Sequence, residues 1–215
     1  MPKLITLLVA LLISLATVAH ADCKDTGKPT WSKQLLELGA DCETKIISPD
    51  GQKILLVKDR GDLSLSSAKG SPFKTVNYKV EPPAMASWAP NSQAFFIDDG
   101  EGSGLSSTFR LFRSHGAHVT RDDSFHQIAV KRFRKTIGCP SSAVDPNVYG
   151  FGWSSDGKQV FLLVQATVNE PCGEPASFIV LIASVADGSV IEQLTEKQTK
   201  KRFRSLLFPE LFQDN

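Results

Sequence analysis

WSSDGKQVFLL, residues 153–163, is the third of three related segments in this chain. The other two are ISPDGQKILLV at residues 47–57 and WAPNSQAFFID at residues 88–98. Each copy has a large apolar residue, then four residues rich in turn formers, then an apolar run. Proline fixes φ, aspartate or asparagine bonds to its local backbone, and glycine accepts a positive φ, as a tight turn requires. Each copy therefore predicts a β-hairpin.

The segments after each hairpin extend it into a unit of four strands. The first two turns begin about 40 residues apart, close to the length of a β-propeller blade. The third turn begins later, so we expect an insertion between the second and third units. The later strands are expected over residues 53–57, 63–67 and 74–80, then 94–97, 107–113 and 118–120, then 159–165, 177–185 and 189–194.

Two short helices are predicted by their capping patterns. Ser124 and Gln127 form a capping-box pattern at the start of a segment with an apolar residue in every fourth position. Gly138 suits the end of that helix. Thr195 and Gln198 form the same pattern after the third unit. Both helical segments contain the sequence Lys-Arg-Phe-Arg, at residues 131–134 and 201–204.

A third short helix is expected over residues 31–38, capped by Thr30 and stopped by Gly39. The expected fold class is therefore mainly β, with three short helices. Its core is a set of four-stranded antiparallel meander repeats arranged like the blades of a β-propeller. The number of visible units leaves open whether the ring is incomplete or contains degenerate blades.

The turn segments resemble the repeat of TolB-type β-propellers, in which an aromatic residue precedes S-P-D-G and a buried strand follows. The resemblance covers residues 47–57, 88–98 and 153–163. TolB proteins join their propeller to an N-terminal α/β domain, and residues 23–45 are too few to form one. The resemblance implies a protein-binding surface in the bacterial periplasm, and it assigns no site residue.

The first 21 residues have the pattern of a secretory signal peptide. Lys3 precedes an apolar run over residues 4–18, and small residues lead to a cleavage site after Ala21. The apolar run is shorter than the ~20 residues that a membrane span needs. We therefore expect a periplasmic or secreted protein without stable membrane insertion, whose residues 22–215 form a single β-propeller-like domain.

The four cysteines of this exported region predict two disulfides. Three connectivities are possible, and we favour Cys23–Cys42 and Cys139–Cys172 because each pair is local in sequence. A zinc site is the alternative for these residues, but the sequence contains no CxxC pair.

Charge limits the classes of partner. The formal net charge is +1 and the signal segment contains one lysine and no acid, so residues 22–215 are neutral. A neutral chain argues against binding to nucleic acid, which calls for a strongly basic surface. The two helical segments nevertheless carry local basic faces that could bind an acidic protein. The candidate binding residues are Lys131, Arg132 and Arg134 in the first, and Lys197, Lys200, Lys201, Arg202 and Arg204 in the second.

The remaining polar clusters suggest metal chemistry. His115, His118 and Asp122 are residue types that bind zinc or copper. Residues 98–102, DDGEG, form an acidic, glycine-rich segment of the kind that calcium uses, although it lacks the EF-hand spacing. Ordinary solvated loops without a metal are the favoured interpretation of both segments.

Taken together, the residues predict an exported binding module for another protein, with an inhibitor or immunity-type protein as one form of it. We expect no cofactor, and the oligomeric state stays open. No catalytic motif such as G-x-S-x-G or H-E-x-x-H is present in the sequence. The alternative is a periplasmic hydrolase or metal-dependent enzyme that uses the region of His115, His118 and Asp122.

Overall fold

The computed structural model describes most of the chain after the expected signal segment. The described residues are 29–30, 32–39, 42–58, 61–67, 70–103, 105–115, 118–140, 142–167, 172, 174 and 177–207. The expected signal peptide and Cys23 lie outside these ranges, so export and cleavage after Ala21 stay predictions. Within the described part, no helix is both long enough and apolar enough to cross a membrane.

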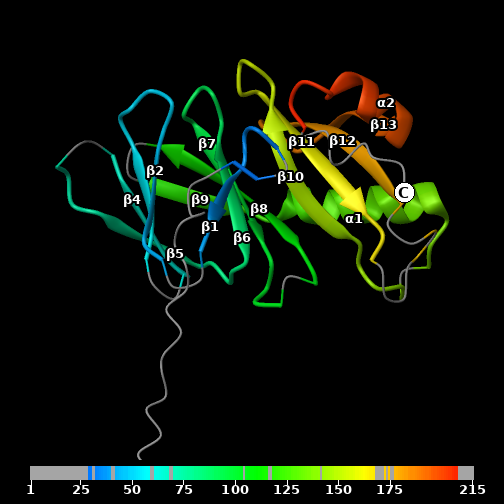
Figure 1. Ribbon diagram of the computed structural model, residues 1–215, viewed down its shortest axis with the longest axis horizontal. Coiled ribbons are helices and arrows are strands. Elements are labelled where there is room, and N and C mark those ends of the chain that lie inside the picture. The colour runs from blue at the N-terminus through cyan, green and yellow to red at the C-terminus, as the bar shows by residue number, and fades with distance from the viewer. Residues whose placement is uncertain are drawn as a thin grey trace, which may run out of the picture.

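The described chain forms three antiparallel sheets that stand side by side (Figure 1). In each sheet, four consecutive strands follow one another in meander order, as expected. The first sheet contains β2 (Thr44–Ile47), β3 (Ile54–Val57), β4 (Asp62–Ser66) and β5 (Lys74–Lys79). The second contains β6 (Ala84–Trp88), β7 (Ala94–Asp99), β8 (Thr108–His115) and β9 (His118–Asp122). The third contains β10 (Asn147–Trp153), β11 (Gln159–Gln165), β12 (Phe178–Ser184) and β13 (Val190–Thr195).

The second sheet lies between two hydrophobic cores and contributes side chains to both. Because successive side chains of a strand point to opposite faces, Phe95 and Ile97 of β7 join the core shared with the first sheet. Phe96 joins the core shared with the third sheet. All six residues of β7 are therefore buried, which explains why this strand lacks an alternating apolar pattern.

The repeated turns form as predicted and also contact one another. Gly51 and Gly157 have φ values of +70° and +69°, and Ser92 has φ +59° at the equivalent position of the second copy. A positive φ is unfavourable for serine, but Ser92 Oγ accepts a hydrogen bond from the N–H of Asp50 at 3.0 Å. The serine that departs from the repeat thus joins the first unit to the second.

The large apolar residue before each turn also links units. The indole Nε1 of Trp88 donates to the carbonyl of Ile46 in the first sheet at 3.3 Å. Trp153 in turn donates to the Ser87 hydroxyl of the second sheet at 3.0 Å. Ile47 occupies the same place in the first unit, before which the described residues contain no further four-stranded sheet, and it is 59% exposed.

Two of the three expected helices are present, namely α1 (Ser124–Ile137) and α2 (Glu196–Arg202). The capping box of α2 is confirmed, because Thr195 and Gln198 bond reciprocally. The capping box expected at Ser124 is wrong, since Ser124 lies inside the helix and Asp122 Oδ1 accepts its N–H at 3.0 Å. Gly138 ends α1 with φ +81°, as expected.

The third expected helix is wrong. Instead of a helix over residues 31–38, the structure has the short strand β1 (Leu36–Leu38), which pairs with β6 and adds a fifth strand to the second sheet. Thr30 does not cap a helix, because its hydroxyl donates to the sulfur of Met85. In this pairing Leu36 and Leu38 of β1 lie opposite Ala86 and Ala84 of β6.

The segment before β1 joins the two described ends of the chain. Gln34 Oε1 accepts the N–H of Trp153 at 2.8 Å, and the Ser32 hydroxyl donates to the carbonyl of Phe151. The N–H of Lys33 donates to the carbonyl of Leu206 at 3.1 Å. Backbone groups at the inner edge of β10 are thereby satisfied by the N-terminal segment rather than by another strand.

One of the two favoured disulfides is confirmed. Cys139, just after α1, is bonded to Cys172, with their Cα atoms 5.9 Å apart. Cys42 is also disulfide-bonded. Its expected partner, Cys23, lies outside the described residues, so that pairing stays a prediction.

Candidate functional site

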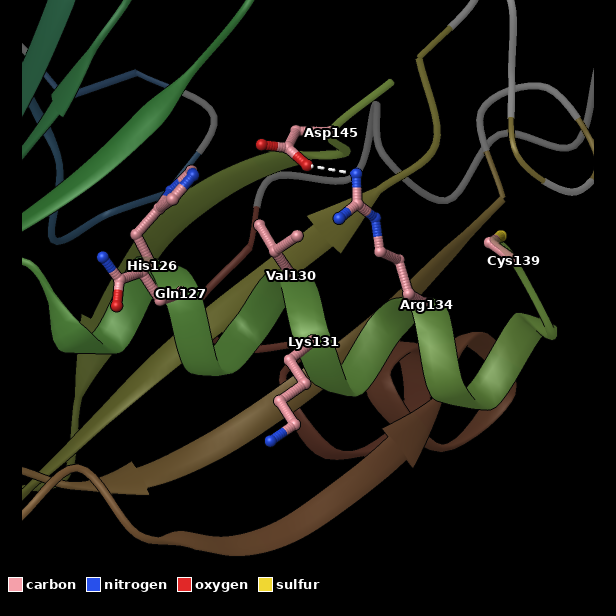
Figure 2. Close-up of a pocket in the computed structure, with 7 residues that line it drawn as sticks. All are labelled: His126, Gln127, Val130, Lys131, Arg134, Cys139 and Asp145. Carbon is pink, nitrogen blue, oxygen red and sulfur yellow. Dashed lines mark ion pairs between the residues drawn. The ribbon is translucent and has the colours of Figure 1, made fainter. Parts of the chain in front are cut away.

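A pocket of about 410 Å³ lies along α1 (Figure 2). His126, Val130 and Arg134 follow one another at spacings of four, which places them on one face of the helix. Asp145, from the segment between the disulfide and β10, lies across from Arg134 and forms the opposite wall. The pocket exists because the Gly138 turn and the disulfide lead the chain back alongside the helix.

Two charged groups of this pocket, Arg134 and Asp145, are already engaged with each other. Arg134 Nη2 lies 2.6 Å from Asp145 Oδ1 and also donates to the carbonyl of Ala143. Burial lowers the pKa of His126, and the nearby Arg110 guanidinium lowers it further. Its buried Nδ1 has no hydrogen-bond partner among the described residues. The pocket therefore contains an imidazole whose pKa is lowered, together with the Arg134–Asp145 ion pair.

The two Lys-Arg-Phe-Arg segments lie on opposite sides of the third sheet (Figure 1). Neighbouring residues of β13 show this: Gln193 bonds to Thr136 of α1, whereas Glu192 forms an ion pair with Arg202 of α2. Adjacent strand residues point to opposite faces, so the helices approach β13 from opposite sides. The shared phenylalanine, Phe133 or Phe203, anchors each segment in the core and is buried.

The predicted basic residues divide into paired and unpaired groups. The paired ones are Arg134 with Asp145, Lys200 with Glu196 at 3.0 Å, and Arg202 with Glu192. Five others have no acidic partner among the described residues, namely Lys131 and Arg132 on α1, and Lys197, Lys201 and Arg204 on or after α2. Figure 2 shows the Lys131 side chain pointing away from the Arg134–Asp145 pair. We call Lys197, Lys201 and Arg204, all exposed, the α2 basic face.

The candidate metal ligands are only partly brought together. His115 and His118 are direct partners across the β8–β9 pairing, whereas Asp122 lies at its far end, opposite Leu111. The Asp122 carboxylate contacts Arg113 Nη1 at 2.5 Å. Burial raises the pKa of Asp122, but hydrogen bonds from Ser124 and Arg113 outweigh it and leave that pKa below its usual value. The described residues contain no group of three or more metal-binding side chains.

The acidic segment at residues 98–102 is not a loop throughout, because Asp98 and Asp99 end β7. Consecutive strand residues face opposite sides, so these two carboxylates cannot bind one calcium ion together. Asp99 accepts hydrogen bonds from the Tyr78 hydroxyl and from the N–H groups of Glu81 and Glu101. Burial, followed by the bond to Asp99, raises the pKa of Tyr78.

Asp98 faces the third sheet and is the site residue that the sequence reasoning placed wrongly. It is 1% exposed, and its Oδ1 accepts the N–H of Gly150 at 2.7 Å. Its Oδ2 has no hydrogen-bond partner among the described residues. Because strand residues two apart share a face, Asp98 lies on the same face of β7 as Phe96.

Comparisons with known proteins identify no family for the chain. No family model matches it, and no curated protein does. Among solved structures, TolB from Acinetobacter baumannii is similar with a TM-score of 0.40 and 17% identity, covering 74% of this chain and 33% of that one. A protein assigned as TolB from Agrobacterium tumefaciens has a TM-score of 0.37 and 19% identity, covering 71% and 44%.

A third similar structure, assigned as a 6-phosphogluconolactonase from Bacteroides fragilis, has a TM-score of 0.40 and 11% identity, covering 73% of this chain and 40% of that one. The chain thus spans less than half of the length of each of these three structures.

Proposed function

We propose that this protein is an exported, periplasmic binding module that recognises an acidic protein partner through the α2 basic face. The carrying observation is that Lys197, Lys201 and Arg204 are exposed and have no acidic partner among the described residues. Two acids near them in the described chain, Glu196 and Glu192, already pair with Lys200 and Arg202. Within the described residues the three cations therefore lack an acidic partner, as a contact with a second molecule requires.

The rigidity of this segment supports the same proposal. The capping box fixes the start of α2, and the Thr199 hydroxyl donates to the carbonyl of Thr195 at 2.9 Å. At the other end, the ring of Phe203 packs against Phe151 and Phe161 of the third sheet. A surface that is ordered before binding loses less entropy on association.

Electrostatics favours a protein as partner over a polyanion. The chain is nearly neutral overall, so a local group of cations gives an attraction of short range. Such groups steer encounter and fix register at protein–protein interfaces. Lys131 and Arg132 lie on the other side of the third sheet, so we assign the main contact to α2.

The test is a charge reversal with a matched control. The variant K197E/K201E/R204E removes the α2 basic face, and K58E/K74E/K79E makes the same change in charge on exposed lysines of the first unit. Mature wild-type protein and both variants serve as bait in a periplasmic extract. We expect wild type and the control to capture the same acidic protein. The α2 variant should capture at least tenfold less of it.

Retention of that partner by the α2 variant, or its loss by the control, would overturn the assignment to α2. Two finer points are tested with the same material. A mature chain that begins at Asp22, by mass spectrometry, would establish cleavage after Ala21. If the captured partner is an enzyme, a fall in its activity on adding the protein would identify an inhibitor or immunity-type role.

A further inference from the structure

A second pocket, of about 250 Å³, lies between the second and third sheets, at their ends opposite the repeated turns. Asp98 from β7 and Tyr149 from β10 line it, together with Glu37 and Met85 from the paired strands β1 and β6. We call it the Asp98 pocket. It is separate from the α2 basic face and from the pocket along α1, with which it shares no described lining residue.

The hydrogen-bonding capacity of the buried Asp98 carboxyl is only half used by the described residues. One carboxyl oxygen is satisfied by the N–H of Gly150, but the other is buried and has no partner among the described residues. An unpaired buried carboxylate is costly, so such groups remain protonated unless a cation or several donors approach them. Consistently, burial raises the pKa of Asp98 well above its usual value.

The other residues that line the pocket favour a ligand with a positive charge. Glu37 is the second acid of the pocket, and none of the described lining residues is a lysine, arginine or histidine. The pKa of Tyr149 is raised, first by burial and then by the neighbouring Asp98. Glu37 and Tyr149 are thus the titratable groups that share the pocket with Asp98, and neither supplies a positive charge.

The shape and the apolar lining limit the ligand further. Met85, Pro83 and Ala84 form an apolar wall, and Ser106 adds a hydroxyl group. The volume is below that of pockets for drug-sized molecules, which start at roughly 300 Å³. A short chain with one charged end matches these dimensions.

We propose that the Asp98 pocket binds a small organic cation with a primary ammonium group. The ammonium donates hydrogen bonds to Asp98 Oδ2 and to the Glu37 carboxylate, and its short apolar chain packs on Met85. Because an ammonium ion stabilises the ionised carboxylate, Asp98 gives up its proton to solvent when the cation binds. Binding therefore releases a proton and weakens as the pH falls.

The experiment is isothermal titration calorimetry with n-butylammonium as the probe. Neutral n-butanol and anionic butyrate are compared with it, because they keep the apolar chain and change the charge. The mature wild-type protein is compared with D98N, E37Q and the control D62N, which changes an exposed carboxyl of β4. Asparagine at position 98 keeps an oxygen for the N–H of Gly150, so D98N should fold.

We expect saturable 1:1 binding of n-butylammonium to wild type and D62N, and no binding of n-butanol or butyrate. D98N should weaken binding at least tenfold, and E37Q by a smaller factor. For wild type, the heats measured in phosphate and in HEPES should differ in proportion to the difference between the ionisation heats of the two buffers, because the released proton is taken up by the buffer. For D98N the two heats should agree. Equal binding by D98N, binding of n-butanol, or no saturable heat in the millimolar range would overturn the proposal.

Discussion

The side-chain amide of Asn91 donates a hydrogen bond to the backbone carbonyl of Asp156, 3.0 Å away. These residues occupy the same position in the second and third copies of the repeated turn. A donor is needed there, and aspartate, which occupies this position in the other two copies, could not supply it. Together with the bond from Asp50 to Ser92, it connects all three turns into one row.

The contact between turns predicts unequal effects of alanine at equivalent glycines. A Cβ at Gly157 would lie 2.6 Å from the Asn91 side chain, whereas one at Gly51 would meet no atom within 4 Å. Gly51→Ala should cost about 1–2 kcal/mol for the positive φ alone. Gly157→Ala should cost at least about 1 kcal/mol more in urea unfolding of the oxidised protein.

Asn91→Ala provides the control for that comparison, because it removes the atoms that the new methyl group would strike. In the Asn91→Ala background, the two glycine substitutions should therefore have similar effects on the free energy of unfolding. An unchanged difference between them would show that Asn91 is not the obstacle.

The hydrogen bonds of the tryptophan indoles predict that substitutions at equivalent positions of two units differ in their effect on stability. Trp153→Phe removes the bond to Ser87 from a buried site and should lower the free energy of unfolding by about 1–3 kcal/mol. Ile47→Ala, at the equivalent exposed position, should change it by less than about 0.5 kcal/mol. Guanidinium unfolding at constant pH measures both, and a cost for Ile47→Ala as large as for Trp153→Phe would contradict the assigned roles.

Asp98 predicts a pH dependence of stability. Its pKa is raised in the folded protein, while the unfolded value is about 3.9. Below the unfolded value both states hold the proton, and as the pH rises the unfolded chain releases it first, so wild type loses stability. Asp98→Asn does not titrate. The stability of D98N relative to wild type, measured by urea unfolding, should therefore increase as the pH rises above about 4. A difference independent of pH would contradict this.

The confirmed disulfide predicts a large effect on stability. Cys139 and Cys172 are separated by 33 residues, and opening a loop of that length should cost roughly 3–4 kcal/mol. The variant with both cysteines changed to serine should unfold at correspondingly lower denaturant. A loss below about 1 kcal/mol would mean that the bond adds little constraint to the unfolded chain.

The sequence predicted the hairpins well because turn chemistry is local. Residues 159–165, expected as a strand, are β11 with the same bounds. The same reasoning failed at residues 31–38, where Leu35 and Leu38 have helical spacing but are buried by contacts with distant parts of the chain. Strand pairing with β6 decided that segment, and no local pattern reports a pairing across nearly 50 residues.

The candidate sites were predicted less completely, since they depend on which sheet face a residue occupies. The two Lys-Arg-Phe-Arg segments look equivalent in sequence, yet they pack on opposite sides of the third sheet. Asp98 looked like part of a loop because carboxylates are uncommon inside strands. Its position became visible only through its pairing with Met85 and Phe109 on the neighbouring strands.

Each of the two tryptophans, Trp88 and Trp153, bonds to the unit that precedes its own in the sequence. Trp88 bonds to a strand made before it, and Trp153 bonds to the strand that includes Trp88. Each unit, as it is synthesised, therefore finds its docking surface already present in the preceding one. The protein can assemble progressively from its N-terminal unit, and a chain interrupted after the second unit would retain a complete first joint.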